Sequence, residues 1–115
     1  AEIPVTDLDR AIEFYSAVTG RELTLEEGGP NPMAQFAFEP GVGVGGHLYP
    51  GTPAKDGAGP TVHLGVYDTV EETAARLEAA GGTLVGPIVT IPVGRFQYAI
   101  DLDGNSIGLF QATGS

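Results

Sequence analysis

The 115-residue chain contains no cysteine, which excludes disulfide bridges, thiolate metal ligands and cysteine nucleophiles. It carries only 5 lysine and arginine residues against 15 aspartate and glutamate residues, so its formal net charge is −10. Binding a phosphate backbone needs clustered lysine and arginine, and we therefore expect neither nucleic acid nor a membrane surface as a partner. No apolar run is long enough to cross a bilayer and no signal peptide is visible, so we predict a cytoplasmic protein.

Apolar residues are plentiful, at 42% of the chain, which is enough for a packed core. The sequence also repeats itself at an offset of 61 residues, since residues 3–23 match residues 64–84. The identical pairs are Val5 and Val66, Asp7 and Asp68, Gly20 and Gly81, and Leu23 and Leu84. Such a repeat indicates that one module of about 55 residues has been duplicated.

Each half predicts one strand, one helix and then three further strands. Asp7 is a suitable N-cap for the first helix, and Asp68 with Glu71 has the spacing of a capping box for the second. Apolar residues recur at helical spacing after both, and Gly20 and Gly81 suit the left-handed position that ends a helix. The predicted strands are residues 3–5, 23–25, 34–38, 42–48, 62–66, 83–91, 96–101 and 106–111.

We therefore predict an α+β fold of two tandem βαβββ modules that form a cupped, mostly antiparallel mixed sheet. The first module is expected at residues 1–52 and the second at residues 61–115. The Gly- and Pro-rich segment 53–60 is expected to link them. One such module covers only one face of its sheet, so the two modules should pack together.

Four stretches carry a family resemblance: IPVTDLDRAIEFYSAVTG at 3–20, GVGGHL at 43–48, DTVEETAARLEAAGG at 68–82 and IDLDGNSIGLF at 100–110. In these the chain resembles the vicinal oxygen chelate superfamily, which includes glyoxalase I, bleomycin-resistance proteins, fosfomycin-resistance enzymes and extradiol dioxygenases. The resemblance implies the paired-module fold and a cavity for a small organic ligand. In this superfamily that cavity often forms between modules, sometimes from two chains, so we expect a homodimer.

The resemblance also implies where metal-dependent members hold their metal, on the first and last strand of each module. The matching positions here are the residue before Ala1, His47, Thr61 and Gly108. Only His47 offers a good donor, because threonine is a poor ligand and glycine has no side chain. We therefore predict no metal and no other cofactor, and we expect Gly108 to allow close approach of a ligand.

His63 lies two residues beyond Thr61 and so on the same face of its strand, and its repeat equivalent is Glu2. We predict that Glu2, His47 and His63 line one concave face as the catalytic, acid–base residues. Two readings stay open beside this one: a shifted Fe(II), Mn(II) or Zn(II) site, and histidines that only form hydrogen bonds in a polar cavity.

The predicted ligand-binding residues are Phe36, Thr61, Gln97, Tyr98, Gly108 and Phe110. Alternation puts Phe96 and Tyr98 on one strand face and Gln97 on the other, without telling which face lines the cavity.

The leading functional hypothesis is a glyoxalase-like small-molecule-binding protein or a metal-independent isomerase or lyase of unknown substrate. One alternative is a divalent-metal-dependent lyase or dioxygenase whose site is shifted or is completed by a residue before Ala1. Another is a bleomycin-resistance-like protein that sequesters an antibiotic. An interaction domain without a small ligand is the third. Convergence of the two histidines favours the enzyme, and their separation favours the binding protein.

Overall fold

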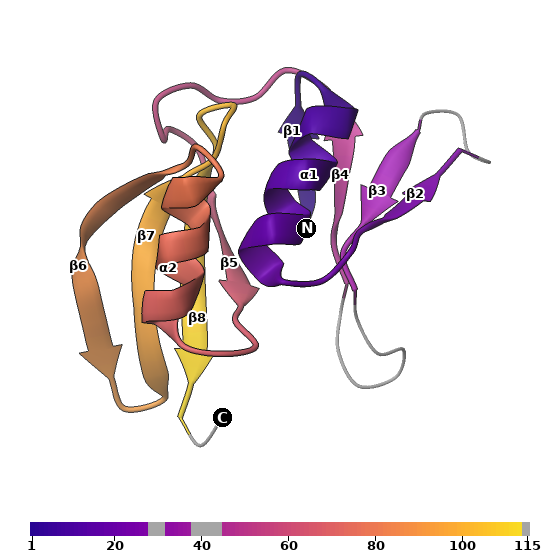
Figure 1. The fold of residues 1–115 in the computed structure, drawn as a ribbon. Coiled ribbons are helices and arrows are strands. Elements are labelled where there is room, and N and C mark those ends of the chain that lie inside the picture. The colour runs from indigo at the N-terminus through magenta and orange to yellow at the C-terminus, as the bar shows by residue number, and fades with distance from the viewer. Residues whose placement is uncertain (28–31, 38–44, 114–115) are drawn as a thin grey trace.

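The computed structural model describes residues 1–27, 32–37 and 45–113 and shows two modules side by side (Figure 1). The first contains β1 (Glu2–Val5), α1 (Leu8–Thr19), β2 (Thr24–Glu26), β3 (Met33–Gln35) and β4 (His47–Pro50). The second contains β5 (Thr61–Gly65), α2 (Val70–Ala79), β6 (Thr83–Ile91), β7 (Gly94–Ile100) and β8 (Ser106–Ala112). The predicted order of strands and helices is present in both halves.

Each module builds a four-stranded mixed sheet with the same topology. The first sheet has the order β1-β4-β3-β2 and the second the order β5-β8-β7-β6. The first strand of each module pairs in parallel with the last, and the other pairs are antiparallel. The prediction of an α+β fold of two repeated βαβββ modules is therefore confirmed. Residue 38 and residues 42–44 of the predicted strands lie outside the described residues.

Both helices begin and end with local signals, one of which differs from the prediction. Asp7 caps α1 by accepting a hydrogen bond from the Arg10 amide at 3.1 Å, and Gly20 ends it at a φ of 73°. The cap of α2 is Thr69 rather than Asp68, and its hydroxyl accepts from the Glu72 amide at 3.1 Å. The capping box thus lies one residue later than predicted, because the Asp68 carboxylate is engaged by an arginine.

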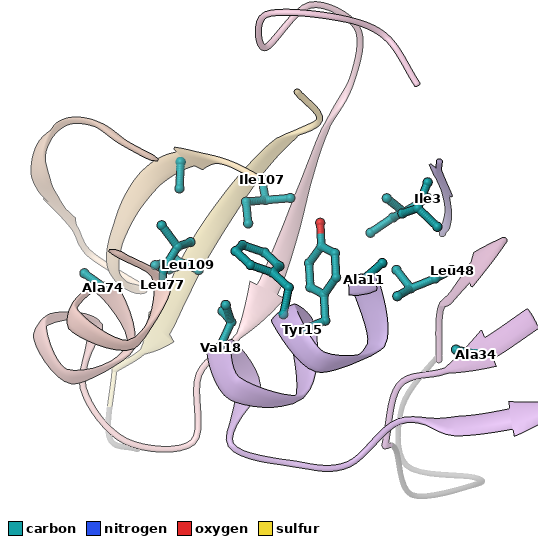
Figure 2. Packing of buried hydrophobic residues seen from close by; sticks show 13 residues of the cluster. Ile3, Ala11, Tyr15, Val18, Ala34, Leu48, Ala74, Leu77, Ile107 and Leu109 are labelled. Carbon is teal, nitrogen blue, oxygen red and sulfur yellow. The ribbon is translucent and has the colours of Figure 1, made fainter. Parts of the chain in front are cut away.

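The hydrophobic core lies on the helix-facing sides of the two sheets (Figure 2). Leu48 from the first sheet and Leu109 from the second are fully buried, and Tyr15 of α1 is 1% exposed. Figure 2 shows Tyr15 with Leu48 on one side and Ile107 on the other, so α1 packs toward both sheets. Because strand side chains alternate, the other face of each sheet points away from this core. No helix among the described residues is long and apolar enough to cross a membrane.

A buried hydrogen-bond network joins α1 to the second module. The Tyr15 hydroxyl donates to Asp101 Oδ2 at 2.6 Å, and burial raises the Tyr15 pKa well above its ordinary value, helped by the Asp101 charge. Asp101 also accepts from the Asn105 amide at 2.9 Å, which shapes the turn between β7 and β8. Asn105 Nδ2 in turn donates to the Pro4 carbonyl at 2.8 Å. The acidic turn is therefore a structural joint between the modules.

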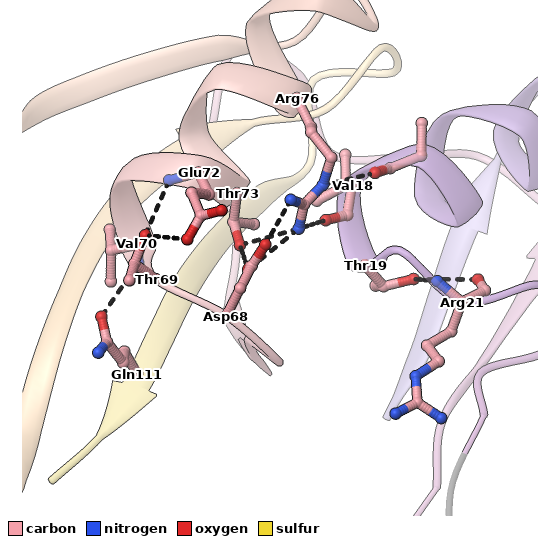
Figure 3. A network of polar contacts seen from close by, with 11 residues as sticks. Val18, Thr19, Arg21, Asp68, Thr69, Val70, Glu72, Thr73, Arg76 and Gln111 are labelled. Atoms are coloured by element: carbon pink, nitrogen blue, oxygen red, sulfur yellow. Dashed lines mark hydrogen bonds and ion pairs between the residues drawn. The ribbon is translucent and has the colours of Figure 1, made fainter. Parts of the chain in front are cut away.

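Arg76 makes the reciprocal connection, from α2 to the C-terminal end of α1 (Figure 3). Its guanidinium donates to the Ala17 carbonyl at 3.1 Å and to the Val18 carbonyl at 3.2 Å, which are two of the carbonyls left unpaired at a helix end. It also binds Asp68 at 2.6 Å, and these hydrogen bonds lower the Asp68 pKa from its ordinary value. Each helix thus contributes one side chain that reaches the other module.

Candidate functional site

On the first sheet, the predicted residues Glu2 and His47 lie side by side. They are register partners on the parallel strands β1 and β4. His47 Nε2 lies 3.1 Å from Glu2 Oε1, while the Glu2 side chain is 73% exposed. This pair is a histidine–carboxylate contact on the solvent side of the sheet, where salt and water weaken the interaction.

On the second sheet, the equivalent register partners are His63 and Gly108 on β5 and β8. A Cβ atom on Gly108 would collide with the His63 ring, since its three nearest atoms would all be imidazole atoms at 3.0 Å or less. The His63 imidazole therefore lies over the backbone of Gly108. Gly108 thus leaves space on β8 that is filled by the histidine ring from the neighbouring strand β5.

Three aromatic rings surround that imidazole. The centroids of Phe96, Tyr98 and Phe110 lie 5.7, 5.8 and 6.4 Å from the centroid of His63, all in edge-to-face geometry. We call His63, Phe96, Tyr98 and Phe110 the aromatic face; they lie on the side of the second sheet that points away from the core. Tyr98 is 41% exposed, so a molecule that approaches from solvent can reach these rings.

Thr61 lies on the same side of the second sheet as His63. Its hydroxyl oxygen lies 2.6 Å from the Ser106 hydroxyl oxygen, next to the aromatic face. Thr61, Tyr98, Gly108 and Phe110 from the predicted ligand-binding set are thus gathered on one surface. Phe96 belongs there too, as the strand alternation with Tyr98 requires.

Two predicted ligand-binding residues lie elsewhere. Gln97 is 8% exposed on the opposite face of β7, and its amide donates to the Gly86 carbonyl at 2.9 Å. Phe36 packs edge-to-face against Tyr15, at a centroid separation of 5.4 Å, on the first module. Neither side chain therefore lines the aromatic face of its own chain.

The structure does not bring Glu2, His47 and His63 onto one face within a chain. Glu2 and His47 belong to the first sheet, and His63 belongs to the aromatic face of the second. Across residues 1–27, 32–37 and 45–113, no three His, Asp or Glu side chains come together as a metal-binding group. The residues at the family's metal positions therefore do not fit a metal: Gly108 has no donor, and its space is taken by an imidazole.

Comparison with known families agrees with the fold of two repeated modules. The family model described as the glyoxalase/bleomycin resistance protein/dioxygenase superfamily matches residues 1–109. The chain belongs to this superfamily. The resemblance drawn from the sequence motifs is thereby confirmed, and the superfamily accounts for the two βαβββ modules.

Several solved structures resemble nearly the whole chain. An antibiotic binding protein from Streptomyces sp. CB03234, TnmS3, is 28% identical with a TM-score of 0.64, over 98% of this chain and 93% of its own. A glyoxalase/bleomycin resistance protein from the same organism is 28% identical with a TM-score of 0.63, over 96% of both chains. One from Albidiferax ferrireducens T118, 20% identical with a TM-score of 0.74 over 96% and 93%, shows the fold alone. The search of curated proteins gave no match.

Proposed function

We propose that this protein binds a small organic molecule with a flat, apolar part on its aromatic face. The observation that carries the proposal is the His63 imidazole lying over Gly108 among Phe96, Tyr98 and Phe110. Aromatic rings with a few polar groups are typical of small-molecule sites. A flat ligand would stack on or against these rings, and the His63 ring nitrogens and the Thr61 hydroxyl would supply hydrogen bonds.

Sequestration is the form of binding that the structure favours. The two histidines lie on separate sheets, and the donor set does not fit a metal, so a single chain offers contact surface rather than assembled chemistry. The similarity to an antibiotic binding protein supports the same reading.

We further propose a homodimer in which a second copy covers the aromatic face and leaves a cavity for the ligand. Apolar side chains on or next to this face are exposed, among them Val85 at 44% and Val89 at 37%. Val85 and Val89 are the β6 register partners of Tyr98 and Phe96, so the apolar surface continues across the sheet. Light scattering on the purified chain measures the mass directly, and a monomer at micromolar concentration contradicts this part of the proposal. A cytoplasmic location stays a prediction.

A metal-independent isomerase or lyase is the second candidate, favoured by the exposed imidazole and by the Glu2–His47 pair. In a dimer that stacks the first sheet of one copy on the second sheet of the other, the partner's pair would face His63. His63 would then exchange a proton with the ligand as a general acid or base. Release of the ligand chemically unchanged contradicts this candidate and leaves sequestration.

The test is a binding screen with small neutral and cationic aromatic compounds, read by saturation-transfer NMR. We expect hits whose binding weakens about tenfold in Tyr98→Ala and in His63→Ala, since each variant removes a ring that contacts the ligand. Leu25→Ala is the matched control, because Leu25 is also an exposed apolar residue, at 45%, but lies on β2 of the first module. Hits that bind equally to wild type and both aromatic-face variants contradict the proposal. Mass spectrometry of the recovered hit separates sequestration from catalysis.

A further inference from the structure

A cavity of about 370 Å³ lies between the two modules, and its lining includes His63 but not Phe96, Tyr98 or Phe110 of the aromatic face. The first module contributes Thr19, Arg21, Phe36 and the backbone of Gly46, and the second contributes Leu64 and Tyr67. We call it the intermodule cleft. Its volume is within the range of small-molecule sites in proteins.

Arg21 supplies a positively charged side chain to this cleft. Its guanidinium lies 4.3 Å from the centroid of the Tyr67 ring, which holds it by a cation–π contact. The Tyr67 hydroxyl reaches back to the Ala37 carbonyl at 3.4 Å. Figure 3 shows the Arg21 side chain pointing away from the Arg76 network. A stacked guanidinium keeps its edge N–H groups free to bind a planar anion such as a carboxylate.

The C-terminal end of α1, which lies next to Arg21, is bound by a different arginine. The last carbonyls of α1 carry a partial negative charge, and Arg76 already donates to Ala17 and Val18 there. The Thr19 hydroxyl donates to the Tyr15 carbonyl at 2.8 Å. Among the described residues, the ion pairs of the arginines are Arg76 with Asp68 and Arg95 with Glu71, and neither involves Arg21.

The free edge of β5 supplies further hydrogen-bonding groups. The Val66 amide donates to the Phe110 carbonyl at 2.8 Å, so the backbone N–H and C=O groups of Val66 and of every second residue before it point toward β8. The backbone groups of the residues between them, His63 and Gly65, therefore point away from β8. Both residues line the cleft, and β8 is the strand that pairs with β5 in its sheet. The cleft thus has backbone donors and acceptors along one side.

We propose that the intermodule cleft is a second ligand site, which binds a small organic carboxylate of apolar body. The carboxylate pairs with Arg21, a polar group near it bonds the β5 edge at His63 and Gly65, and the apolar body packs against Phe36 and Leu64. The chain has a net charge of −10, so an anion is attracted to the cleft by this local positive charge and repelled by most of the remaining surface. The site does not rest on the proposed function: it uses the His63 backbone, whereas the aromatic face uses the His63 ring.

The test is an NMR titration of the ¹⁵N-labelled chain with a matched pair of probes, N-acetyl-L-phenylalanine and its neutral amide. The acid should shift the backbone amides of His63 and Gly65 and the Nε–H resonance of Arg21, and it should bind at least about tenfold more tightly than the amide. Benzoate and phenylacetate, with their amides, extend the probe set. Arg21→Gln should weaken binding of the acid about tenfold, and Arg21→Lys should weaken it less because it keeps the charge but loses the planar fork.

Arg10→Gln is the matched control, since it also removes one positive charge but lies on the first turn of α1. It should leave binding of the acid unchanged. Equal affinity for acid and amide, an unchanged affinity in Arg21→Gln, or no acid that shifts the cleft resonances each overturns the proposal. Tyr98→Ala keeps the two sites distinguishable, because it should weaken binding at the aromatic face about tenfold while the acid binds the cleft with unchanged affinity.

Discussion

The two modules place different residues at the same two positions of one fold. In the first module the register partners on the first and last strands are Glu2 and His47, which form an exposed pair at 3.1 Å. In the second module they are His63 and Gly108, and the imidazole lies across the glycine among aromatic rings. The second module has no side chain at the position that His47 occupies in the first. The solvated polar contact of the first module is therefore replaced by an apolar surface with one polar ring.

A second pair of equivalent positions carries the contact between modules. Tyr15 on α1 and Arg76 on α2 are separated by the repeat offset of 61 residues. Tyr15 donates to Asp101 of the second module, and Arg76 donates to Ala17 and Val18 of the first. The duplicated position has kept its direction toward the other module while its chemistry has diverged, one a buried neutral group and the other a half-buried cation.

Tyr15→Phe is expected to have the largest effect on stability. It removes the hydroxyl that donates to a buried carboxylate, so the free energy of unfolding should fall by about 2 kcal/mol. Urea unfolding followed by circular dichroism measures this. Tyr49→Phe is the control, because the Tyr49 hydroxyl makes no hydrogen bond with other described residues, and it should cost less than about 0.5 kcal/mol. Equal costs for the two variants would show that the joint through Asp101 does not contribute.

Gly108→Ala is expected to disrupt the aromatic face with little change in stability. The new Cβ would push the His63 ring off β8, so the NMR signals of the Phe96 and Tyr98 rings should move. Binding of an aromatic hit should weaken about tenfold, equivalent to about 1.4 kcal/mol. The same substitution in a His63→Ala background is the control, and there it should have no further effect. An additive loss in that background would mean that Gly108 acts independently of the His63 ring.

Asp68→Asn should lower the free energy of unfolding by about 1 kcal/mol at neutral pH, because the partly exposed pair with Arg76 loses its charge. The Asp68 pKa is lowered in the folded chain from its ordinary value of 3.8. Its contribution is therefore complete above that value and is lost as the pH falls through the lower, folded-state pKa. Urea unfolding of wild type and variant between pH 7 and pH 2 should show the gap closing below about pH 4. A gap that persists unchanged to pH 2 contradicts the ion pair.

Glu2→Gln should have the smallest effect, because the Glu2–His47 pair is exposed to solvent. We expect a change of less than about 0.5 kcal/mol in the free energy of unfolding, and less still at high salt. Urea unfolding at two salt concentrations checks this. A loss above about 1 kcal/mol would show that the Glu2–His47 pair stabilises the fold, and that the two modules do not differ in the way proposed.

Most of the fold follows from the sequence, because its signals are local or repeated. The 61-residue repeat, the cap at Asp7 and the glycine at position 20 fix the modules and helix ends, and β6 begins and ends where predicted. The cap of α2 was placed one residue early, because only the structure shows that Arg76 engages Asp68. That contact is made by a side chain two turns away and leaves no mark at the cap itself.

The candidate site was less predictable, since it depends on how two sheets are placed. The repeat relates Glu2 to His63 and His47 to Gly108, but only the strand register pairs Glu2 with His47 and His63 with Gly108, and the repeat carries no information on whether the two pairs meet. Alternation groups Phe96 with Tyr98 without saying which face is buried, and burial then places Gln97 on the other side. Arg21 and Tyr67 were missed because they lie in loops, where no periodicity marks a residue that lines a cleft.

The position of the His63 imidazole over Gly108, in the middle of the aromatic face, can be checked by a nuclear Overhauser spectrum of the labelled chain. We expect contacts from the His63 ring protons to the Gly108 α-protons and to the Phe96 and Tyr98 rings, with the α-protons shifted upfield by the imidazole. A His63 ring without contacts to Gly108, and glycine α-protons at their ordinary positions, would contradict it.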